Sequence, residues 1–446
     1  MNQKGFIPIV VIVTVIIVLT ASGGAFWMYQ KSATTPSETS LESESRKMVE
    51  LKPVAQESIP QELPSPTVQI KTPPPPPQSR QPLQPKTQPE YRPESVNIQQ
   101  CQGTKAKFDY APVNLDKTLV MMPRGLMVGD HVTPVNHHYF QNFGNKEFDI
   151  EVYSPGGGFI TDIGHMPRAE EGKDYNIRIE HTCTLSSHYI YVSNLPAKIK
   201  AYAPPTHGYR GVRIPVAAGE LIGYYKKNLD YNLIDRAITL TGFVVPEHYA
   251  VEPDKTHIVR DTYGYFNEPV KSKLIERSIR TVEPISGKID YDIDGKLVGN
   301  WFLEGTNGYA GAVTEFGRSG SWLGHLSIAY DYIDPSRIVI SIVGYGVEDS
   351  KQFGVKGNSP DPAGVSIESG LIKYELVDYD YIASNGSRWD RMSFAKGLKT
   401  VGMENTQGVV LVQMLGGGRK IKFETFPGKT ASEVSGFTGA ARIYER

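Results

Sequence analysis

Apolar and polar residues alternate in short segments from residue 101 onward. Three such segments are residues 148–153, 175–180 and 189–192. A period of two predicts half-buried β-strands, and turn-forming sequences should separate them. The turns expected here lie at residues 154–158, at Gly164 and at residues 217–220. We therefore expect an antiparallel β domain over residues 101–258.

A second alternating region occupies residues 287–446. Its expected hairpins pair residues 288–293 with 297–302 across Asp294-Gly295, 326–333 with 338–343, and 409–415 with 420–426. Hairpins repeated in this way predict an up-and-down barrel or a sandwich. Residues 350–364 are expected to be an exposed loop. Gly299-Asn300-Trp301 is similar to the Gly-x-Trp near the first strand of lipocalin-like barrels, although a core tryptophan explains it equally well.

A single helix is expected between the two β regions. Val270, Leu274, Ile275 and Ile279 have helical spacing within residues 261–282. Prolines near the start and after the end of this stretch fit a helix of that length. We expect residues 259–286 to be a connector that packs on one of the β domains.

The N-terminal segment predicts a membrane anchor. Residues 6–28 are an apolar run without a charged residue, and roughly 20 such residues span a bilayer as a helix. Lys4 and the amino terminus place positive charge before the run, which keeps that end cytoplasmic. Residues 1–31 should therefore be a single-pass anchor in the cell membrane, with the bulk of the chain extracellular. A cleaved signal peptide is the alternative, since Ala21-Ser22-Gly23 could be a cleavage site.

Residues 32–100 are predicted to be a disordered, proline-rich linker. They contain five consecutive prolines at 73–77 and almost no aromatic residues. Such a segment cannot bury enough apolar surface to offset the entropy of ordering. Polyproline stretches extend it, so we expect a semi-rigid spacer.

Charge and cysteine content narrow the functional classes. The net charge is −1, with 47 basic and 48 acidic residues, so nothing favours nucleic acid as a partner. The only cysteines are Cys101 and Cys183, which excludes a disulfide framework and a cysteine zinc site. In an exported protein a Cys101–Cys183 disulfide is favoured. A free buried thiol and a metal pair of Cys183 with His181 are the alternatives.

Histidines are concentrated in the first β region. His137, His138, His181 and His188 are four of ten in the chain, and imidazoles are common zinc ligands. Neighbouring strand residues point to opposite faces, so His137 and His138 cannot bind one metal unless a bulge intervenes. The alternative is that these are exposed or hydrogen-bonded imidazoles without a metal.

Residues 129–245 resemble the lysostaphin-type (LytM-like) zinc endopeptidases, a β fold that cleaves peptidoglycan cross-bridges. The resemblance lies in the order of residues 136–140, 152–160, 177–181, 189–195 and 216–223. The last stretch has the form V-x-x-G-x-x-I-G. The resemblance implies a zinc site with a histidine followed four residues later by an aspartate, and a late His-x-His.

The departures from this family fall on its catalytic positions. Gln141 and Asn142 stand where the aspartate should follow His137 or His138, and Tyr191 replaces a catalytic histidine. Residues 237–243, expected to be the late strand, contain no histidine. A hydrolytic zinc needs about three protein ligands. The sequence therefore predicts no catalytic residues and no cofactor in a degenerate copy of the fold.

We therefore expect a mainly β, membrane-anchored envelope protein with an inactive peptidase-like domain that binds or scaffolds. Its partners would be cell-wall glycan or peptide, or an envelope protein, with Tyr139, Tyr189, Tyr191 and Trp301 as candidate binding residues. One alternative is an active zinc-dependent cell-wall hydrolase with a rearranged site. Another is a C-terminal barrel that binds an apolar small molecule.

Overall fold

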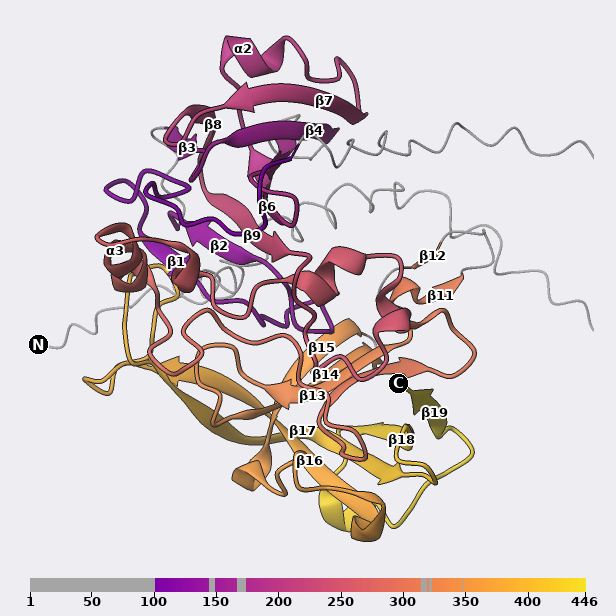
Figure 1. The fold of residues 1–446 in the computed structure, drawn as a ribbon. Helices are drawn as coiled ribbons and strands as arrows, with labels where there is room; N and C mark the ends of the chain where they lie inside the picture. Colours follow the sequence, from indigo (N-terminus) through magenta and orange to yellow (C-terminus); the bar gives the residue numbers. More distant parts are fainter. Residues whose placement is uncertain (1–100, 144–148, 167–173, 314–318, 321–322, 347) are drawn as a thin grey trace, which may run out of the picture. The chain divides into compact units, whose positions relative to one another are not determined.

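The computed structural model describes residues 101–143, 149–166, 174–313, 319–320, 323–346 and 348–446. These residues belong to one compact unit, which contains a seven-stranded sheet and a closed barrel (Figure 1). The predicted anchor and linker lie outside the described residues, and both stay predictions. Within the described part, no helix has the length and apolar character needed to cross a membrane.

The first β region forms an antiparallel sheet with the order β1-β2-β9-β6-β5-β4-β7. Its strands are β1 (Val120–Met122), β2 (His138–Gln141), β4 (Gly158–Met166), β5 (Asp174–Glu180), β6 (Leu185–Val192), β7 (Gly208–Val216) and β9 (Asn228–Asp235). The short helix α2 (Ala197–Lys200) connects β6 to β7. A separate antiparallel pair consists of β3 (Ile150–Tyr153) and β8 (Leu221–Tyr225). Figure 1 shows β6, β9, β2 and β1 as neighbours in this sheet.

One face of this sheet lies in a hydrophobic core. Tyr231 of β9, Tyr189 of β6 and Ile177 of β5 lie opposite one another, and all three are fully buried. Burial of a large apolar side chain contributes roughly 1.5–3 kcal/mol, so this face stabilises the strands. The strands predicted at residues 175–180 and 189–192 are confirmed, and β6 begins earlier than expected, at Leu185.

Two predictions in this region are wrong. Gly164 lies within β4 rather than in a turn, because Tyr209 of β7 packs over it. A Cβ atom at residue 164 would lie 2.6 Å from the Tyr209 ring. Residues 237–243 are not a strand; β9 is the strand that follows β8, and its own residues alternate with a period of two.

The second β region closes into an antiparallel barrel, which confirms the predicted mainly β fold with a barrel. Its strands are β10 (Gly299–Leu303), β13 (His325–Tyr330), β14 (Ile338–Tyr345), β15 (Glu348–Val355), β16 (Leu371–Ile382), β17 (Lys399–Met414), β18 (Lys420–Pro427) and β19 (Arg442–Glu445). The first strand pairs with β13 on one side and with β19 on the other. Two short strands, β11 (Ala312–Val313) and β12 (Ser319–Gly320), pair with each other.

The hairpins β13–β14 and β17–β18 are those predicted. Residues 350–364 are not simply a loop, because β15 occupies their first part. Residues 288–293 are not a strand either. Their carboxylates accept backbone N–H groups instead: Asp290 from Gly242 and Asp292 from Val244 and Asn300.

The barrel interior is filled by packed apolar side chains. Trp301, Phe353, Tyr374 and Val410 are fully buried members of one cluster. The Trp301 indole N–H donates to the carbonyl of Leu297 over 2.8 Å. Trp301 is therefore a fully buried core residue, as the alternative explanation of the Gly-x-Trp sequence had it, and this burial contradicts its prediction as a binding residue.

The connector contains less helix than predicted. Only α3 (Val270–Arg277) is α-helical, and Leu274 is its buried contact with the core of the sheet. The 3-10 helices η2 (Pro246–Tyr249), η3 (Pro253–His257) and η4 (Tyr263–Tyr265) lie between β9 and α3. Clusters of buried residues include members from both β regions, so the sheet and the barrel share apolar packing.

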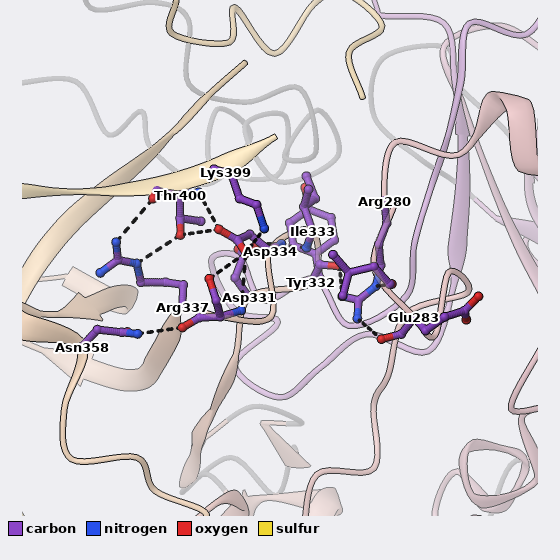
Figure 2. A network of polar contacts seen from close by, with 12 residues as sticks. Arg280, Glu283, Asp331, Tyr332, Ile333, Asp334, Arg337, Asn358, Lys399 and Thr400 are labelled. Carbon is purple, nitrogen blue, oxygen red and sulfur yellow. Dashed lines mark hydrogen bonds and ion pairs between the residues drawn. The ribbon is translucent and has the colours of Figure 1, made fainter. Parts of the chain in front are cut away.

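Polar contacts fix the β13–β14 turn against the connector and β17 (Figure 2). The Asp334 carboxylate accepts bonds from the Thr400 backbone at 2.8 Å and from the Thr400 hydroxyl at 3.0 Å. Lys399 lies 3.3 Å from the same carboxylate. From the connector, Arg280 donates to the carbonyl of Tyr332 over 2.7 Å. The start of β17 is therefore held in place by this turn.

Candidate functional site

A row of polar side chains crosses the sheet on the face opposite the core. His188 of β6 lies opposite Asn232 of β9 and opposite Arg178 of β5, and Arg178 lies opposite Asp162 of β4. His137, just before β2, extends this row beyond Asn232, as their hydrogen bond shows. Residues opposite each other in antiparallel strands share a face. We call these five residues the polar row.

His137 and Asn232 are joined directly. The Asn232 amide nitrogen donates to Nδ1 of His137 over 2.7 Å, which leaves the ring proton on Nε2 in this orientation. Neighbouring strands lie about 4.8 Å apart, so the backbones at His137 and His188 are roughly 10 Å apart, with Asn232 between them. The row thus places one amide between two imidazoles.

Arg178 is held by a carboxylate from outside the sheet. Its guanidinium lies 2.7 Å from Asp254 in η3, and Arg236 lies 3.0 Å from the other oxygen of that carboxylate. Although burial acts to raise it, the two guanidinium groups hold the pKa of Asp254 below its usual value. Asp254 therefore positions the Arg178 side chain beside His188.

Two atoms of the row have hydrogen-bonding capacity left over. The amide oxygen of Asn232 and one terminal nitrogen of Arg178 are buried and have no hydrogen-bond partner among the residues that the structure describes. Asn176 lies two residues before Arg178 in β5, on the same face, and its amide oxygen is also buried without a hydrogen-bond partner among the described residues. Buried polar atoms without partners are costly, so these atoms are suited to contact a polar ligand or water.

Both imidazoles of the row are neutral at physiological pH. Burial lowers the pKa of His137 to about 3, and the nearby His188 acts in the same direction. Burial also lowers the pKa of His188 to about 3, reinforced by the Arg178 charge. At the other end, burial raises the pKa of Asp162 to about 6, although Arg178 opposes this. Near neutral pH the row therefore carries two neutral imidazoles, the Arg178 cation and a mostly ionised Asp162 carboxylate.

Tyr191 has the most unusual backbone near the row. Its φ is 72°, a left-handed conformation that costs roughly 1–3 kcal/mol in a residue other than glycine. The pairing of β5 with β6 shifts register here, as at a β-bulge, and bulges redirect side chains. Tyr191 is half-buried, while Tyr139 of β2 is buried opposite Asp230. The Tyr139 ring lies 6.3 Å from that of His137, and Tyr191 follows His188 by three residues in β6.

The other predicted site residues lie elsewhere. His138 is on the core face, where Nδ1 contacts the carbonyl of Met122 at 3.1 Å and Nε2 contacts the hydroxyl of Thr262 at 3.0 Å. His181 lies beyond the end of β5 and uses both ring nitrogens, on Gly157 and Ser187. Tyr189 is fully buried and donates to the carbonyl of Tyr153, so its prediction as a binding surface is wrong.

The described residues do not fit a hydrolytic zinc. The four predicted histidines do not converge, since His138 faces the core and His181 lies at the end of β5. The row itself offers two imidazoles, an amide and a guanidinium, and a cation beside His188 opposes metal binding. No group of three His, Cys, Asp or Glu side chains in the described residues could hold a metal ion.

The two cysteines are bonded to each other. Cys101 and Cys183 form a disulfide with a sequence separation of 82 residues. Cys183 is exposed in the turn between β5 and β6, and its backbone N–H donates to the carbonyl of Gly103. The bridge thus attaches the beginning of the folded region to the β5–β6 hairpin, and Cys183 is not free to bind a metal with His181.

The sequence did not single out Asn232 and Arg178 as site residues. The signal for Asn232 is the alternation in β9, where Asn228, Asp230 and Asn232 occupy every second position between apolar residues. The signal for Arg178 is the alternation in β5, where it lies between Ile177 and Ile179. A strand with three such residues on one face has a strongly polar surface. The late strand was expected at residues 237–243, whereas β9 is the strand that occupies this place in the sheet.

Comparisons with known proteins give little further information. No family model matches the chain, and no curated protein matches it. Part of the chain is weakly similar to the crystal structure of a zinc-containing peptidase from Vibrio cholerae, at 19% identity and a TM-score of 0.18. That match covers 30% of this chain and 38% of the peptidase, so this chain spans well under half of that protein.

Proposed function

We propose that this protein is a membrane-anchored envelope protein whose polar row binds a neutral polar ligand without hydrolysing it. The observation that carries the proposal is the pair of buried, unpartnered atoms, Asn232 Oδ1 and Arg178 Nη1. A ligand that supplies a donor to the amide and an acceptor to the guanidinium would satisfy both.

Cell-wall glycan and peptide have the chemistry that this row would recognise. Hydroxyl and amide groups donate and accept hydrogen bonds without a net charge, which suits the neutral imidazoles of His137 and His188. Tyr191 follows His188 by three residues in β6 and is half-buried, so it would add an aromatic surface. The packed interior of the barrel gives no comparable support to the alternative of an apolar ligand in that domain.

Binding of soluble peptidoglycan fragments to the full-length protein tests this proposal. Calorimetry should give an affinity that Asn232→Leu weakens by roughly tenfold or more, since one buried hydrogen bond contributes about 1.5 kcal/mol. Asn385→Leu changes an exposed asparagine in the β16–β17 loop and serves as the matched control. Equal affinity in the wild type and in Asn232→Leu would contradict the assignment of the row as the binding site.

Metal content and cleavage separate binding from hydrolysis. The purified protein should contain no stoichiometric zinc, and peptidoglycan fragments should remain intact after incubation with it. Zinc present in equal amount to the protein, and lost in His137→Ala, would instead support the alternative of a rearranged zinc hydrolase.

The proposed location rests on the apolar run at residues 6–28. The full-length chain should remain with the membrane fraction after washing with high salt, and added protease should degrade residues 101–446 from the extracellular side. A mature chain that begins shortly after Gly23 would show a cleaved signal peptide in place of an anchor.

A further inference from the structure

We infer that the loop at residues 383–398, between β16 and β17, contacts the surface of an anionic lipid bilayer. The loop carries two large apolar side chains in solvent, Met392 at 42% exposure and Phe394 at 36%. Exposed apolar residues that stand together on an ordered loop, with basic residues around them, are typical of interfacial membrane contacts.

The loop is held rigidly from within. Trp389 is buried, its backbone N–H donates to the carbonyl of Tyr381, and its indole N–H donates to the carbonyl of Ser393 over 2.8 Å. One oxygen of Asp390 accepts the backbone N–H groups of Met392 and Ser393, at 2.8 and 2.9 Å. These bonds fix the turn that presents Met392 to solvent.

The C-terminal end of the loop is also anchored. Leu398 is buried, and the residues that follow it, Lys399 and Thr400, are held by Asp334 in the network of Figure 2. Because the backbone is already ordered, insertion of Met392 and Phe394 would cost little conformational entropy. The ordered backbone of the loop therefore keeps both side chains in solvent.

The surroundings of the loop are basic. Residues 383–399 contain four basic residues, Arg388, Arg391, Lys396 and Lys399, against one acidic residue, Asp390. Arg388 and Arg391 share a single carboxylate, that of Asp380, at 3.7 and 3.2 Å, and Lys399 is paired with Asp334. Counting Asp390 as well, the four basic residues face three carboxylates, which leaves an excess of one positive charge.

Helix α3 extends this basic surface. The Lys396 ammonium donates to the carbonyl of Ile275 in α3 over 3.3 Å, which brings the helix beside the loop. The helix adds Lys271, Lys273 and Arg277 against Glu276, and Lys273 is exposed. Anionic headgroups attract such a cluster, while Met392 and Phe394 match the apolar layer beneath them.

The length of chain before Cys101 allows this contact. Residues 32–100 separate the predicted membrane segment from the folded region. The predicted proline-rich spacer would span at most roughly 210 Å when fully extended, and any less extended arrangement would bring the folded region closer to the bilayer in which the anchor lies. The inference is independent of the ligand proposed for the polar row.

A fluorescent probe on the loop tests the inference in the full-length protein. Met392→Cys introduces the single free thiol, because the native cysteines are bonded to each other, and an environment-sensitive dye is attached to it. The chain is reconstituted in vesicles of phosphatidylcholine, alone or mixed equally with phosphatidylglycerol. We expect a blue shift, and quenching by nitroxide-labelled lipid, only in the anionic vesicles.

Two sets of variants test the cause of the insertion. Lys273→Gln combined with Lys396→Gln should lower the ratio of inserted to free loop roughly 30-fold. Phe394→Ser should abolish quenching. Because this side chain is 36% exposed, the substitution should lower the melting temperature only slightly, and the loop should stay ordered. The same dye at Ile367→Cys, an exposed apolar position beside Glu368, should show no quenching in either type of vesicle.

Other outcomes would overturn the inference. Equal dye emission in neutral and anionic vesicles would do so, as would insertion that the two lysine substitutions do not change. A blue shift that appears without vesicles, on addition of a soluble wall polyphosphate, would assign the surface to a polyanion of the cell wall instead of to lipid.

Discussion

Nδ1 of His137 and the amide nitrogen of Asn232 lie 2.7 Å apart, so this ring nitrogen accepts a hydrogen bond from an amide and is not available to bind a metal ion. The asparagine lies between two neutral imidazoles in a row that also contains a guanidinium. This single contact separates the polar row from a hydrolytic zinc centre more clearly than any feature recognised in the sequence.

The neutral imidazoles predict a dependence of stability on pH. The pKa of His137 and of His188 is about 3 in the folded state, against about 6.5 in an unfolded chain, so protons bind preferentially to the unfolded chain. The contribution of each neutral imidazole to the free energy of unfolding is complete above about pH 6.5. It is lost as the pH falls from about 6.5 towards 3, by up to about 1.4 kcal/mol per pH unit.

Urea unfolding at pH 7 and pH 5 measures this effect as the difference between the two free energies of unfolding. His188→Gln should reduce this difference, while His207→Gln, at an exposed position, should leave it unchanged. Ring resonances of His137 or His188 that titrate with a midpoint near 6.5 would show that the imidazoles are not protected from protonation.

Arg178 and Arg236 bind the same carboxylate, that of Asp254, but should contribute differently to the free energy of unfolding. The Arg178 side chain is 24% exposed and that of Arg236 is 49% exposed. Arg178→Met should lower the free energy of unfolding by about 2 kcal/mol, because it removes the better-buried partner of Asp254. Arg236→Met should cost less than about 1 kcal/mol. Similar losses in both variants, measured by denaturant unfolding, would argue against a special position for Arg178.

The disulfide should be a major source of stability. Cys101→Ser with Cys183→Ser should lower the free energy of unfolding by about 2–4 kcal/mol, since the bridge closes a long loop. Reductant should destabilise the wild type by the same amount and leave the double variant unaffected. If reductant has no effect on the wild type, the bridge is absent from the purified protein.

The Asp334 network should stabilise the β13–β14 turn. Asp334→Ala removes the acceptor for the backbone and hydroxyl groups of Thr400, and we expect a loss of about 2–3 kcal/mol. Asp294→Ala, which removes an exposed pair with Arg419, should leave the melting temperature unchanged. Hydrogen exchange at the Thr400 amide should accelerate in Asp334→Ala alone.

The mainly β architecture could be predicted from the sequence because alternation is a local signal. The turn at residues 334–337 and the three glycines before Arg419 correctly located the β13–β14 and β17–β18 hairpins. Gly164 was misread as a turn because glycine there accommodates Tyr209 from a different strand. That contact depends on the pairing of β4 with β7, which local sequence does not reveal.

The candidate site was harder to predict, because it depends on register. His137 and His138 are adjacent in sequence, yet one faces the polar row and the other the core. Opposite faces were expected for the pair, but which histidine would meet His188 depends on how β2, β9 and β6 align. Arg178 gains its role from Asp254, 76 residues away along the chain, and no local pattern connects the two.

The Cys101–Cys183 bridge has a mechanical consequence. A pull on the chain ahead of Cys101 would pass through the sulfur atoms to the β5–β6 turn, and so directly into the middle of the sheet. Residues 102–182 would bear none of that load and could not be peeled away from the N-terminal side. A pulling force on the N-terminal side would therefore have to separate several hydrogen-bonded strands at once. Forced unfolding should require a higher force when the disulfide is intact than when it is reduced.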